Sequence, residues 1–337
     1  MIHYKRILIE KFGGPEVLSL IEESGLPEPK DNEVRIKVLY TSANFTDIMI
    51  RRGMYPEVKE KPPFSPGYDM VGVIDQVGDA VTRFREGDKV ADMTVTGAYS
   101  QYMCLPENQL IHLPDKVDPA EAVSTILSYV TAYQMLHRIA NIKPEQKILV
   151  HGAGGAVGLA MLQLGKLMNL EMYGTASASK HDLIIENGGI PIDYRETDFA
   201  TYIKNNTPKG VNAVFDPIGG NNFKKSFSIL KKQGKLVAFG FYNAVMGKGG
   251  NIPVDFMNLQ FRNLLPNKKS ATFYSIGALR KKHPDWFIED LTTIFKMLGD
   301  KKIHPLIERK IKIDQAAEAH QIIENRQNKG KIIFQLN

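Results

Sequence analysis

The run Lys147-Ile-Leu-Val-His-Gly-Ala-Gly-Gly-Ala-Val-Gly158 constrains the fold more than any other segment of the 337-residue chain. A short apolar strand leads directly into a glycine-rich turn, and Val157–Met168 follows with apolar residues at helical spacing. The last two motif glycines have the spacing at which a backbone approaches a pyrophosphate and a helix packs closely on a strand. The turn therefore predicts a dinucleotide site formed by Gly155, Ala156, Val157 and Gly158. The alternative is a tight turn in a non-binding α/β domain. That alternative does not explain why the turn has four glycines, each of which costs conformational entropy on folding.

The second strand of this pattern indicates which dinucleotide is bound. Glu171–Thr175 reads as that strand, and Gly174-Thr-Ala-Ser-Ala-Ser-Lys-His181 follows it without an acidic residue. A site for NAD usually carries Asp or Glu there, to bind the ribose 2′-hydroxyl. Hydroxyls and a cation instead suit a 2′-phosphate, so Thr175, Ser177 and Lys180 predict NADPH as the cofactor. Lys180 has a second interpretation, as a solvated lysine at a helix start.

The periodicity of the chain changes near residue 120. Before it, short strands such as Arg6–Glu10, Glu33–Tyr40 and Met70–Val77 alternate with turns, which predicts a β-rich, barrel-like domain. After it, strands and helices alternate, which predicts a parallel sheet with helices on both faces. Near the end, Asp314–Asn325 reads as a helix and Lys331–Leu336 as a closing strand. We therefore expect a dinucleotide domain over 123–265, inserted into a discontinuous domain of 1–122 and 266–337.

Composition excludes several classes of protein. Cys104 is the one cysteine, so an intramolecular disulfide or a multi-cysteine zinc site is impossible. The net charge of +6 comes from lysines scattered in short groups, so we expect no nucleic-acid partner. Charges interrupt the first apolar stretch, and no uncharged apolar run is long enough to span a bilayer. We expect a cytoplasmic protein.

The chain resembles the zinc-free quinone oxidoreductase branch of the medium-chain dehydrogenase/reductase superfamily over essentially its whole length. The resemblance rests on the glycine turn, the stretch that ends at His181, and three further motifs. These are Ala43-Asn-Phe-Thr-Asp-Ile-Met-Ile-Arg-Arg-Gly-Met-Tyr-Pro56, Pro66-Gly-Tyr-Asp-Met-Val-Gly-Val-Ile-Asp-Gln-Val-Gly78 and Phe215-Asp-Pro-Ile-Gly-Gly220. Within the branch, the vesicle amine transport homologues are most similar. The resemblance implies an α/β fold, with a doubly wound Rossmann sheet and a discontinuous, β-rich GroES-like domain.

The resemblance also indicates that no metal is bound. Zinc alcohol dehydrogenases carry a Cys ligand where Asn44 stands and a His ligand where Tyr68 stands. Catalytic zinc needs about three ligands of Cys, His or carboxylate type, and neither replacement is one of these.

Individual site residues follow from the same resemblance. It implies that Asn44 and Tyr55 serve catalysis near the nicotinamide and the acceptor, although the branch often has a second tyrosine where Ile48 stands here. The implied cofactor contacts are Asn44, Thr131, Tyr194, Gly240, Arg326 and Lys329. Five of these residues have a structural alternative: helix capping for Asn44 and Thr131, packing for Tyr55 and Tyr194, and a solvated charge for Arg326. Asp47 is interpreted as structural.

Together these features predict hydride transfer from NADPH to a quinone or an α,β-unsaturated carbonyl. A 2-alkenal or enoyl-thioester reductase is one alternative, and a lipid- or membrane-surface-binding protein that keeps the fold is another. For the second, the apolar stretch Phe256–Leu265 before Lys268 and Lys269 is either a membrane-facing segment or a pocket lid or core helix. The resemblance also implies a homodimer, formed through an edge strand at Ala271–Ile276.

Overall fold

The alternation that begins at the glycine turn builds a six-stranded parallel sheet in the computed structural model, which describes residues 2–336. Its strands lie in the order β10-β9-β8-β11-β12-β13. The bounds are β8 Lys147–His151, β9 Glu171–Ala176, β10 Gly189–Asp193, β11 Val211–Asp216, β12 Leu230–Ala238 and β13 Ser270–Phe273. The strand order reverses between β8 and β11, and in doubly wound sheets ligands bind at the carboxyl ends of such strands.

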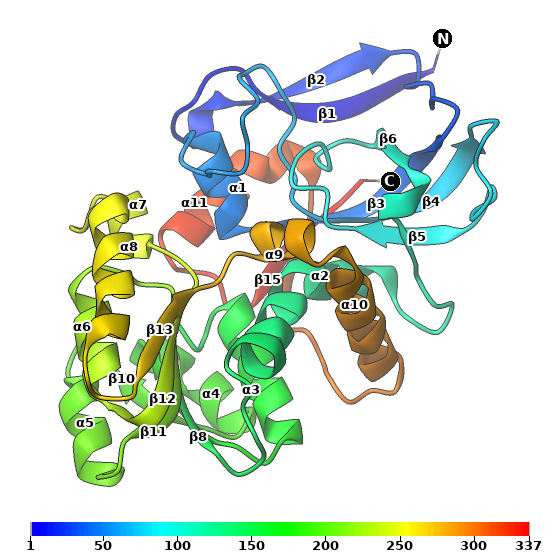
Figure 1. The fold of residues 1–337 in the computed structure, drawn as a ribbon. Helices are drawn as coiled ribbons and strands as arrows, with labels where there is room; N and C mark the ends of the chain where they lie inside the picture. The colour runs from blue at the N-terminus through cyan, green and yellow to red at the C-terminus, as the bar shows by residue number, and fades with distance from the viewer. Residues whose placement is uncertain (1, 337) are drawn as a thin grey trace. The chain divides into compact units, whose positions relative to one another are not determined.

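Helices cover both faces of this sheet (Figure 1). They are α3 Ala156–Leu167, α4 His181–Glu186, α5 Phe199–Asn206 and α6 Asn221–Ser228. Apolar side chains from the strands and from α5 and α6 form one buried core, which includes Leu149, Phe199, Val214 and Phe223. The predicted α/β class with a doubly wound sheet is confirmed.

The rest of this unit is mainly helical. A π-helix, Gln134–Ile139, continues from α2 Pro119–Tyr133, and the next segments are α7 Tyr242–Val245, α8 Ile252–Phe261 and the 3₁₀ turn Arg262–Leu264. α9 Ile276–Lys282 and α10 Pro284–Gly299 follow β13. Both carboxylate oxygens of Asp290 accept hydrogen bonds from the Arg138 guanidinium, at 2.7 to 3.0 Å. Asp290 thereby fixes the end of the π-helix.

The other unit contains a seven-stranded sheet, in which six strands lie in the order β14-β15-β3-β4-β5-β7 and the seventh, β6, pairs with β3. Its strands are β3 Glu33–Ala43, β4 Met70–Val77, β5 Lys89–Asp92, β6 Tyr102–Pro106, β7 Ile111–His112, β14 Ile307–Lys312 and β15 Lys331–Gln335. A separate antiparallel pair is formed by β1 His3–Ile9 and β2 Leu18–Ser24. Because β15 pairs with β3, the last strand of the chain completes the sheet that the first third begins.

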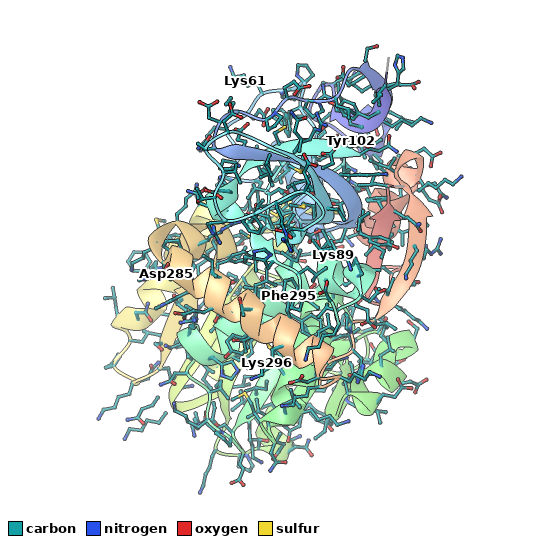
Figure 2. The ribbon with its side chains drawn as sticks, turned by 90° about the vertical axis from the view of Figure 1, so that its right-hand side faces the viewer. Lys61, Lys89, Tyr102, Asp285, Phe295 and Lys296 are labelled. Atoms are coloured by element: carbon teal, nitrogen blue, oxygen red, sulfur yellow. The ribbon has the colours of Figure 1, made fainter. Side chains whose placement is uncertain are left out.

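Two helices pack on one another in this unit, α1 Phe45–Arg51 and α11 Ala316–Glu324. Arg51 is fully buried, and its guanidinium contacts Glu324 and His320 of α11. Burial lowers the pKa of His320 to about 3, so this imidazole is neutral and accepts the hydrogen bond from Arg51. On α10, Phe295 is buried and Lys296 is exposed, and both residues are labelled in Figure 2.

The chain divides into units at slightly different positions from those expected. Met1–Leu127 with Leu291–Asn337 form one unit, and Ser128–Asp290 form the other. The sequence placed the second boundary at residue 265, whereas β13 pairs with β12 and so belongs to the parallel sheet. The sequence did not reveal that β13 pairs with β12, because the segment between these two strands is mostly helical.

The segment 256–265, expected to be a core helix or a pocket lid or else a membrane-facing segment, is largely exposed in the structure. On α8, Leu259 is fully buried and Asp255 is nearly so. The other apolar side chains are exposed, to 44% for Phe256, 55% for Met257, 58% for Phe261 and 76% for Leu264. Leu259 and the partly buried Ile252 therefore anchor the helix to the core, while most of its apolar surface stays exposed.

Candidate functional site

The glycine turn has the close packing that a dinucleotide site requires. A Cβ on Gly158 would lie 2.5 Å from both the Cα of Ala153 and the carbonyl oxygen of Gly152, so only glycine fits. Gly155 is the N-cap of α3 in extended conformation, and a Cβ there would meet only one atom, at 3.3 Å. The first turn of α3 carries no acidic residue, so its N–H groups remain suited to an anion.

The residues predicted to select the cofactor gather near this turn. The side chain of Lys180 lies across Gly154, where a Cβ would be 2.7 Å from the Lys180 Cδ. Ser177 begins the same 3₁₀ turn as Lys180. Asp193, at the end of β10, accepts a hydrogen bond from the Ala178 N–H at 3.0 Å, which brings the neighbouring Tyr194 close to this loop. Tyr194 is 44% exposed, as a contact to an adenine would require.

Thr175 is placed differently from its expected role. Its hydroxyl lies 2.9 Å from Nδ1 of His151, and the residue is almost fully buried. On the other side of the ring, Nε2 of His151 lies 3.0 Å from the Ser226 hydroxyl, which donates to Asp216 at 2.7 Å. Burial lowers the pKa of His151, although Asp216 opposes this. Sequence reasoning missed this network, which ties β8, β9, β11 and α6 together beneath the glycine turn.

Two further predicted contacts belong to the same unit. Gly240 follows β12, and a Cβ there would lie 2.9 Å from the carbonyl oxygen of Pro217, so the backbone passes closely beside the end of β11. Thr131 is buried within α2. Their contact with a nicotinamide stays a prediction.

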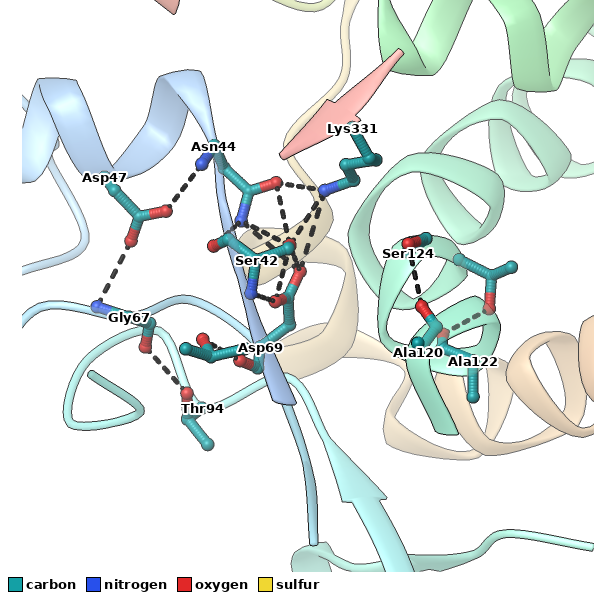
Figure 3. A network of polar contacts seen from close by, with 12 residues as sticks. Ser42, Asn44, Asp47, Gly67, Asp69, Thr94, Ala120, Ala122, Ser124 and Lys331 are labelled. Carbon is teal, nitrogen blue, oxygen red and sulfur yellow. Dashed lines mark hydrogen bonds and ion pairs between the residues drawn. The ribbon is translucent and has the colours of Figure 1, made fainter. Parts of the chain in front are cut away.

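Asn44 lies in a buried polar network in the unit that contains β3 and β15 (Figure 3). The Lys331 ammonium donates to the Asn44 side-chain oxygen and to the Ser42 hydroxyl, the latter at 2.9 Å, and lies 3.9 Å from Asp69. The Asn44 amide nitrogen donates to the Ser42 carbonyl at 3.0 Å and to Asp69 at 3.3 Å. The Ser42 hydroxyl also donates to Asp69, at 2.7 Å. Both ends of the Asn44 amide are thus engaged by the protein.

Burial shifts the pKa values of these groups. It lowers the pKa of Lys331, although the two nearby aspartates oppose this, and it raises the pKa of Asp69, although Lys331 opposes that. The pKa of Asp47 is raised to about 8, chiefly by burial and then by Asp69. Nothing in the spacing of the sequence signalled Lys331, because its partners are nearly 290 residues away.

Asp47 joins this network to the next loop. Its two oxygens accept hydrogen bonds from the backbone N–H of Asn44 at 2.9 Å and of Gly67 at 3.2 Å. The first contact is part of a capping box that begins α1. Asn44 occupies the N-cap position of α1, but its side-chain amide contacts Lys331, Ser42 and Asp69 and makes no hydrogen bond to the helix. The contacts of Asp47 agree with its structural interpretation.

Tyr55 pairs with Tyr68, which stands where the resemblance stated from the sequence puts a zinc ligand in zinc alcohol dehydrogenases. Their hydroxyl oxygens lie 2.6 Å apart, and the rings meet edge to face. Tyr68 is fully buried, and Tyr55 is partly exposed. Ile48 is also fully buried, so that position contributes only packing.

Arg326 and Lys329 lie between α11 and β15, far along the chain from the glycine turn and in the other unit. Arg326 is partly buried with a φ of 57°, and Lys329 is exposed. Their expected contact with cofactor phosphates stays a prediction.

Within residues 2–336, no three His, Cys, Asp or Glu side chains are grouped as metal ligands. In the same residues, no helix is long and apolar enough to cross a membrane.

Comparison with known proteins places this chain among pyridine nucleotide-dependent dehydrogenases and reductases. Residues 30–115 match the alcohol dehydrogenase GroES-like domain, and residues 189–334 match the family described as zinc-binding dehydrogenase. The synaptic vesicle membrane protein VAT-1 homolog of Danio rerio is 32% identical over 98% of this chain and 70% of its own length. The quinone oxidoreductase of Homo sapiens is 30% identical over 98% of both chains.

Solved structures agree with this class. The quinone oxidoreductase of Escherichia coli, in complex with NADPH, has a TM-score of 0.88 at 28% identity, covering 98% of this chain and 99% of that one. The chain therefore belongs to the medium-chain dehydrogenase/reductase superfamily, in its quinone oxidoreductase branch. The resemblance stated from the sequence, including the GroES-like sheet domain, is confirmed.

Exchanging each of the two motif glycines for alanine should separate packing from binding. In Gly158→Ala the new Cβ meets backbone atoms, so we expect a loss of about 1–3 kcal/mol in unfolding free energy without any cofactor. In Gly155→Ala we expect little loss of stability, because Cβ meets only one atom at 3.3 Å, but weaker NADPH binding. Thermal denaturation and fluorescence titration measure both; equal stability of the two variants would contradict this assignment.

Removing the buried ammonium should destabilise the protein strongly. Lys331→Met leaves Asp69 as a buried charge without its cation, so we expect a loss of about 3–5 kcal/mol in unfolding free energy. The double variant Lys331→Met with Asp69→Asn should recover part of that loss, because it removes both charges. Chemical denaturation measures each variant, with exposed Lys302→Met as the control. A loss no larger than that of the control would contradict a paired charge.

Proposed function

We propose that this protein is a zinc-independent, NADPH-dependent oxidoreductase that transfers a hydride to a quinone or an α,β-unsaturated carbonyl. The observation that carries the proposal is the glycine turn with Lys180 lying across it and no acidic side chain at the end of β9. A cation and hydroxyl groups at that place favour a 2′-phosphate, which an aspartate or glutamate would repel. The NADPH complex of the related bacterial quinone oxidoreductase gives the proposal independent support.

The residues of the parallel-sheet unit would hold the cofactor. The N–H groups at the start of α3 would bind the pyrophosphate, with Gly155 allowing the close approach. Ser177 and Lys180 would bind the 2′-phosphate, and Tyr194 would lie against the adenine. Thr175 would act through its backbone or by steadying His151, because its hydroxyl faces that ring. The cofactor supplies the hydride, and the protein binds it, orients it and excludes water.

The residues of the other unit would serve the acceptor. Reduction of a quinone or an enone leaves an oxyanion or enolate that must be stabilised and protonated. Tyr55 carries a partly exposed hydroxyl suited to that task. Asn44 would contribute by fixing the start of α1, since its amide is engaged by Lys331, Ser42 and Asp69.

Metal independence follows from the side chains at the ligand positions. Asn44 and Tyr68 replace the Cys and His that zinc alcohol dehydrogenases use, and both are engaged with other side chains. Activity should therefore survive dialysis against a chelator. Loss of activity that zinc restores would overturn this part of the proposal.

The experiment follows NADPH oxidation with a panel of quinones, enones and enoyl thioesters, and turnover of the first two classes is expected. Turnover of enoyl thioesters alone would favour the alternative reductase. No turnover of any acceptor would reject the enzyme proposal.

Lys180→Ala tests the choice of cofactor. Loss of a charged hydrogen bond to the 2′-phosphate, worth about 1.5–3 kcal/mol, should raise the KM for NADPH about tenfold or more and leave that for NADH unchanged. Exposed Lys209→Ala in the same unit is the control. An equal change for both cofactors would contradict the assignment of Lys180.

We also propose a homodimer, formed by side chains instead of strand pairing. The Asn263 amide donates to the Ala271 carbonyl at 2.9 Å and accepts from the Ala271 N–H at 2.7 Å. This cap occupies the outer edge of β13 where the sequence expected a partner strand. The exposed side chains on α8 and the following 3₁₀ turn form an apolar patch beside it, which favours burial against a second copy.

Leu264→Asp should therefore convert a dimer to a monomer, because it places a charge in the centre of the proposed contact. Light scattering coupled to size exclusion measures the mass, and Ile185→Asp, at an exposed apolar residue of α4, is the control. A wild-type monomer would contradict the dimer. Binding of wild type, but not of Leu264→Asp, to anionic vesicles would favour the membrane-surface alternative instead.

A further inference from the structure

The second tyrosine of the Tyr55–Tyr68 pair has no role in the function proposed so far. The Tyr68 side chain is fully buried, and its oxygen lies 2.6 Å from that of Tyr55. The rings meet edge to face with centroids 5.7 Å apart and an angle of 88° between their planes. Ring packing and the hydrogen bond therefore define the same geometry, with Tyr55 as the more exposed partner.

The backbone around Tyr68 is fixed on both sides (Figure 3). Gly67 has a φ of +115°, and a Cβ there would lie 2.4 Å from the backbone nitrogen of Tyr99. The Gly67 N–H donates to Asp47 at 3.2 Å, and its carbonyl accepts from Thr94 at 2.8 Å. Asp69 is held by Ser42 and Lys331 in the buried network. The backbone on both sides of Tyr68 is thus held in place, partly by the same network that holds Asn44.

The chemistry of proton transfer decides which hydroxyl must donate. When Tyr55 protonates the reduced acceptor, its O–H bond breaks, a new bond to hydrogen forms on the acceptor anion, and the electron pair stays on the Tyr55 oxygen. That phenolate oxygen can only accept hydrogen bonds. The hydrogen of the 2.6 Å contact must then belong to Tyr68, which keeps its own proton while water returns one to Tyr55.

We propose that Tyr68 is a positioning residue that directs the Tyr55 proton toward the acceptor and stabilises the Tyr55 phenolate by donating a hydrogen bond to it. The inference rests on the proposed reductase function and names the source of its proton.

Because Tyr55 is largely buried, a hydrogen-bond donor beside it favours its phenolate form. Burial raises the pKa of Tyr55 well above its usual value, while the hydrogen bond with Tyr68 lowers it. Without that hydrogen bond, the phenolate would be still less accessible. A hydrogen bond to a charged group corresponds to a factor of roughly 10 to 100 in an equilibrium constant.

The first test is a double-mutant cycle with Tyr55→Phe, Tyr68→Phe and the double variant, assayed with the best acceptor of the panel. Tyr102→Phe is the matched control, because Tyr102 packs edge to face on Tyr4 in the same unit, with centroids 6.0 Å apart (Figure 2). We expect kcat to fall about 10- to 100-fold in Tyr68→Phe and at least as much in Tyr55→Phe. The double variant should be within about twofold of Tyr55→Phe, because Tyr68 acts only through Tyr55. The dissociation constant of NADPH should not change.

A second measurement does not depend on turnover. With 3,5-difluorotyrosine at position 55, the phenol ionises at a lower pH and its fluorine resonance reports the pKa. Tyr68→Phe should raise that pKa by about one unit or more, because the phenolate loses its donor. If Tyr68→Phe does not fold, p-aminophenylalanine at position 68, which keeps a donor, should retain the wild-type pKa, and p-fluorophenylalanine should raise it.

The two proposals fail in different ways. Absence of turnover with an elevated pKa in Tyr68→Phe would reject the reductase and keep the hydrogen-bond donor. Turnover by wild type with Tyr68→Phe as active as Tyr102→Phe, or with an unchanged pKa at position 55, would overturn the role of Tyr68. Additive losses in the double variant would also overturn it, since they would mean that Tyr68 acts independently of Tyr55.

Discussion

The buried contact of Lys331 with Asn44, Ser42 and Asp69 is the interaction on which the β-rich unit depends. Lys331 begins the last strand, and its charge lies between Ser42 and Asn44 at the end of β3 and Asp69 just before β4. Such a charge is stable inside a protein only if it is paired and hydrogen-bonded, so β15 has one acceptable position on β3. The strand register, the start of α1 and the loop that carries Tyr68 are therefore set together.

In the parallel-sheet unit, a buried histidine joins several elements at the carboxyl edge of the sheet. His151 ends β8 directly before the glycine turn, and its two nitrogens contact Thr175 and Ser226 from other elements. Because burial keeps this imidazole neutral, one nitrogen donates and the other accepts, which gives the contacts a direction. These contacts hold the end of β8 in place directly before the glycine turn.

Much of the fold was predictable from local pattern, and the network was not. The glycine turn, the alternating strands and helices and the closing strand are signals within about 20 residues, so periodicity and turn chemistry revealed them. Lys331, Asp69 and Tyr68 matter through partners that are distant in sequence or on another element, and no spacing rule connects them. The hydrogen bonds of Asn263 to the backbone of β13 were equally unpredictable, because hydrophobic periodicity does not show whether a side chain covers an edge strand. For Thr175, the sequence identified a hydroxyl at the right strand end but could not show that it faces His151.

The groups at the former zinc-ligand positions suggest how a metal-free site can keep its shape. A zinc ion would tie its ligands together through one cation. Here Asn44 is tied to Asp69 through the Lys331 ammonium, and Tyr68 is tied to Tyr55 through hydroxyls. The ammonium is almost fully buried and holds the network together, whereas Tyr55 is partly exposed. Since residues 68 and 69 are adjacent, one dipeptide carries both arrangements, and a shift of its backbone moves both side chains. A substitution that loosens Lys331 should thus disturb the tyrosine pair as well, which joins the stability of this unit to its proposed chemistry.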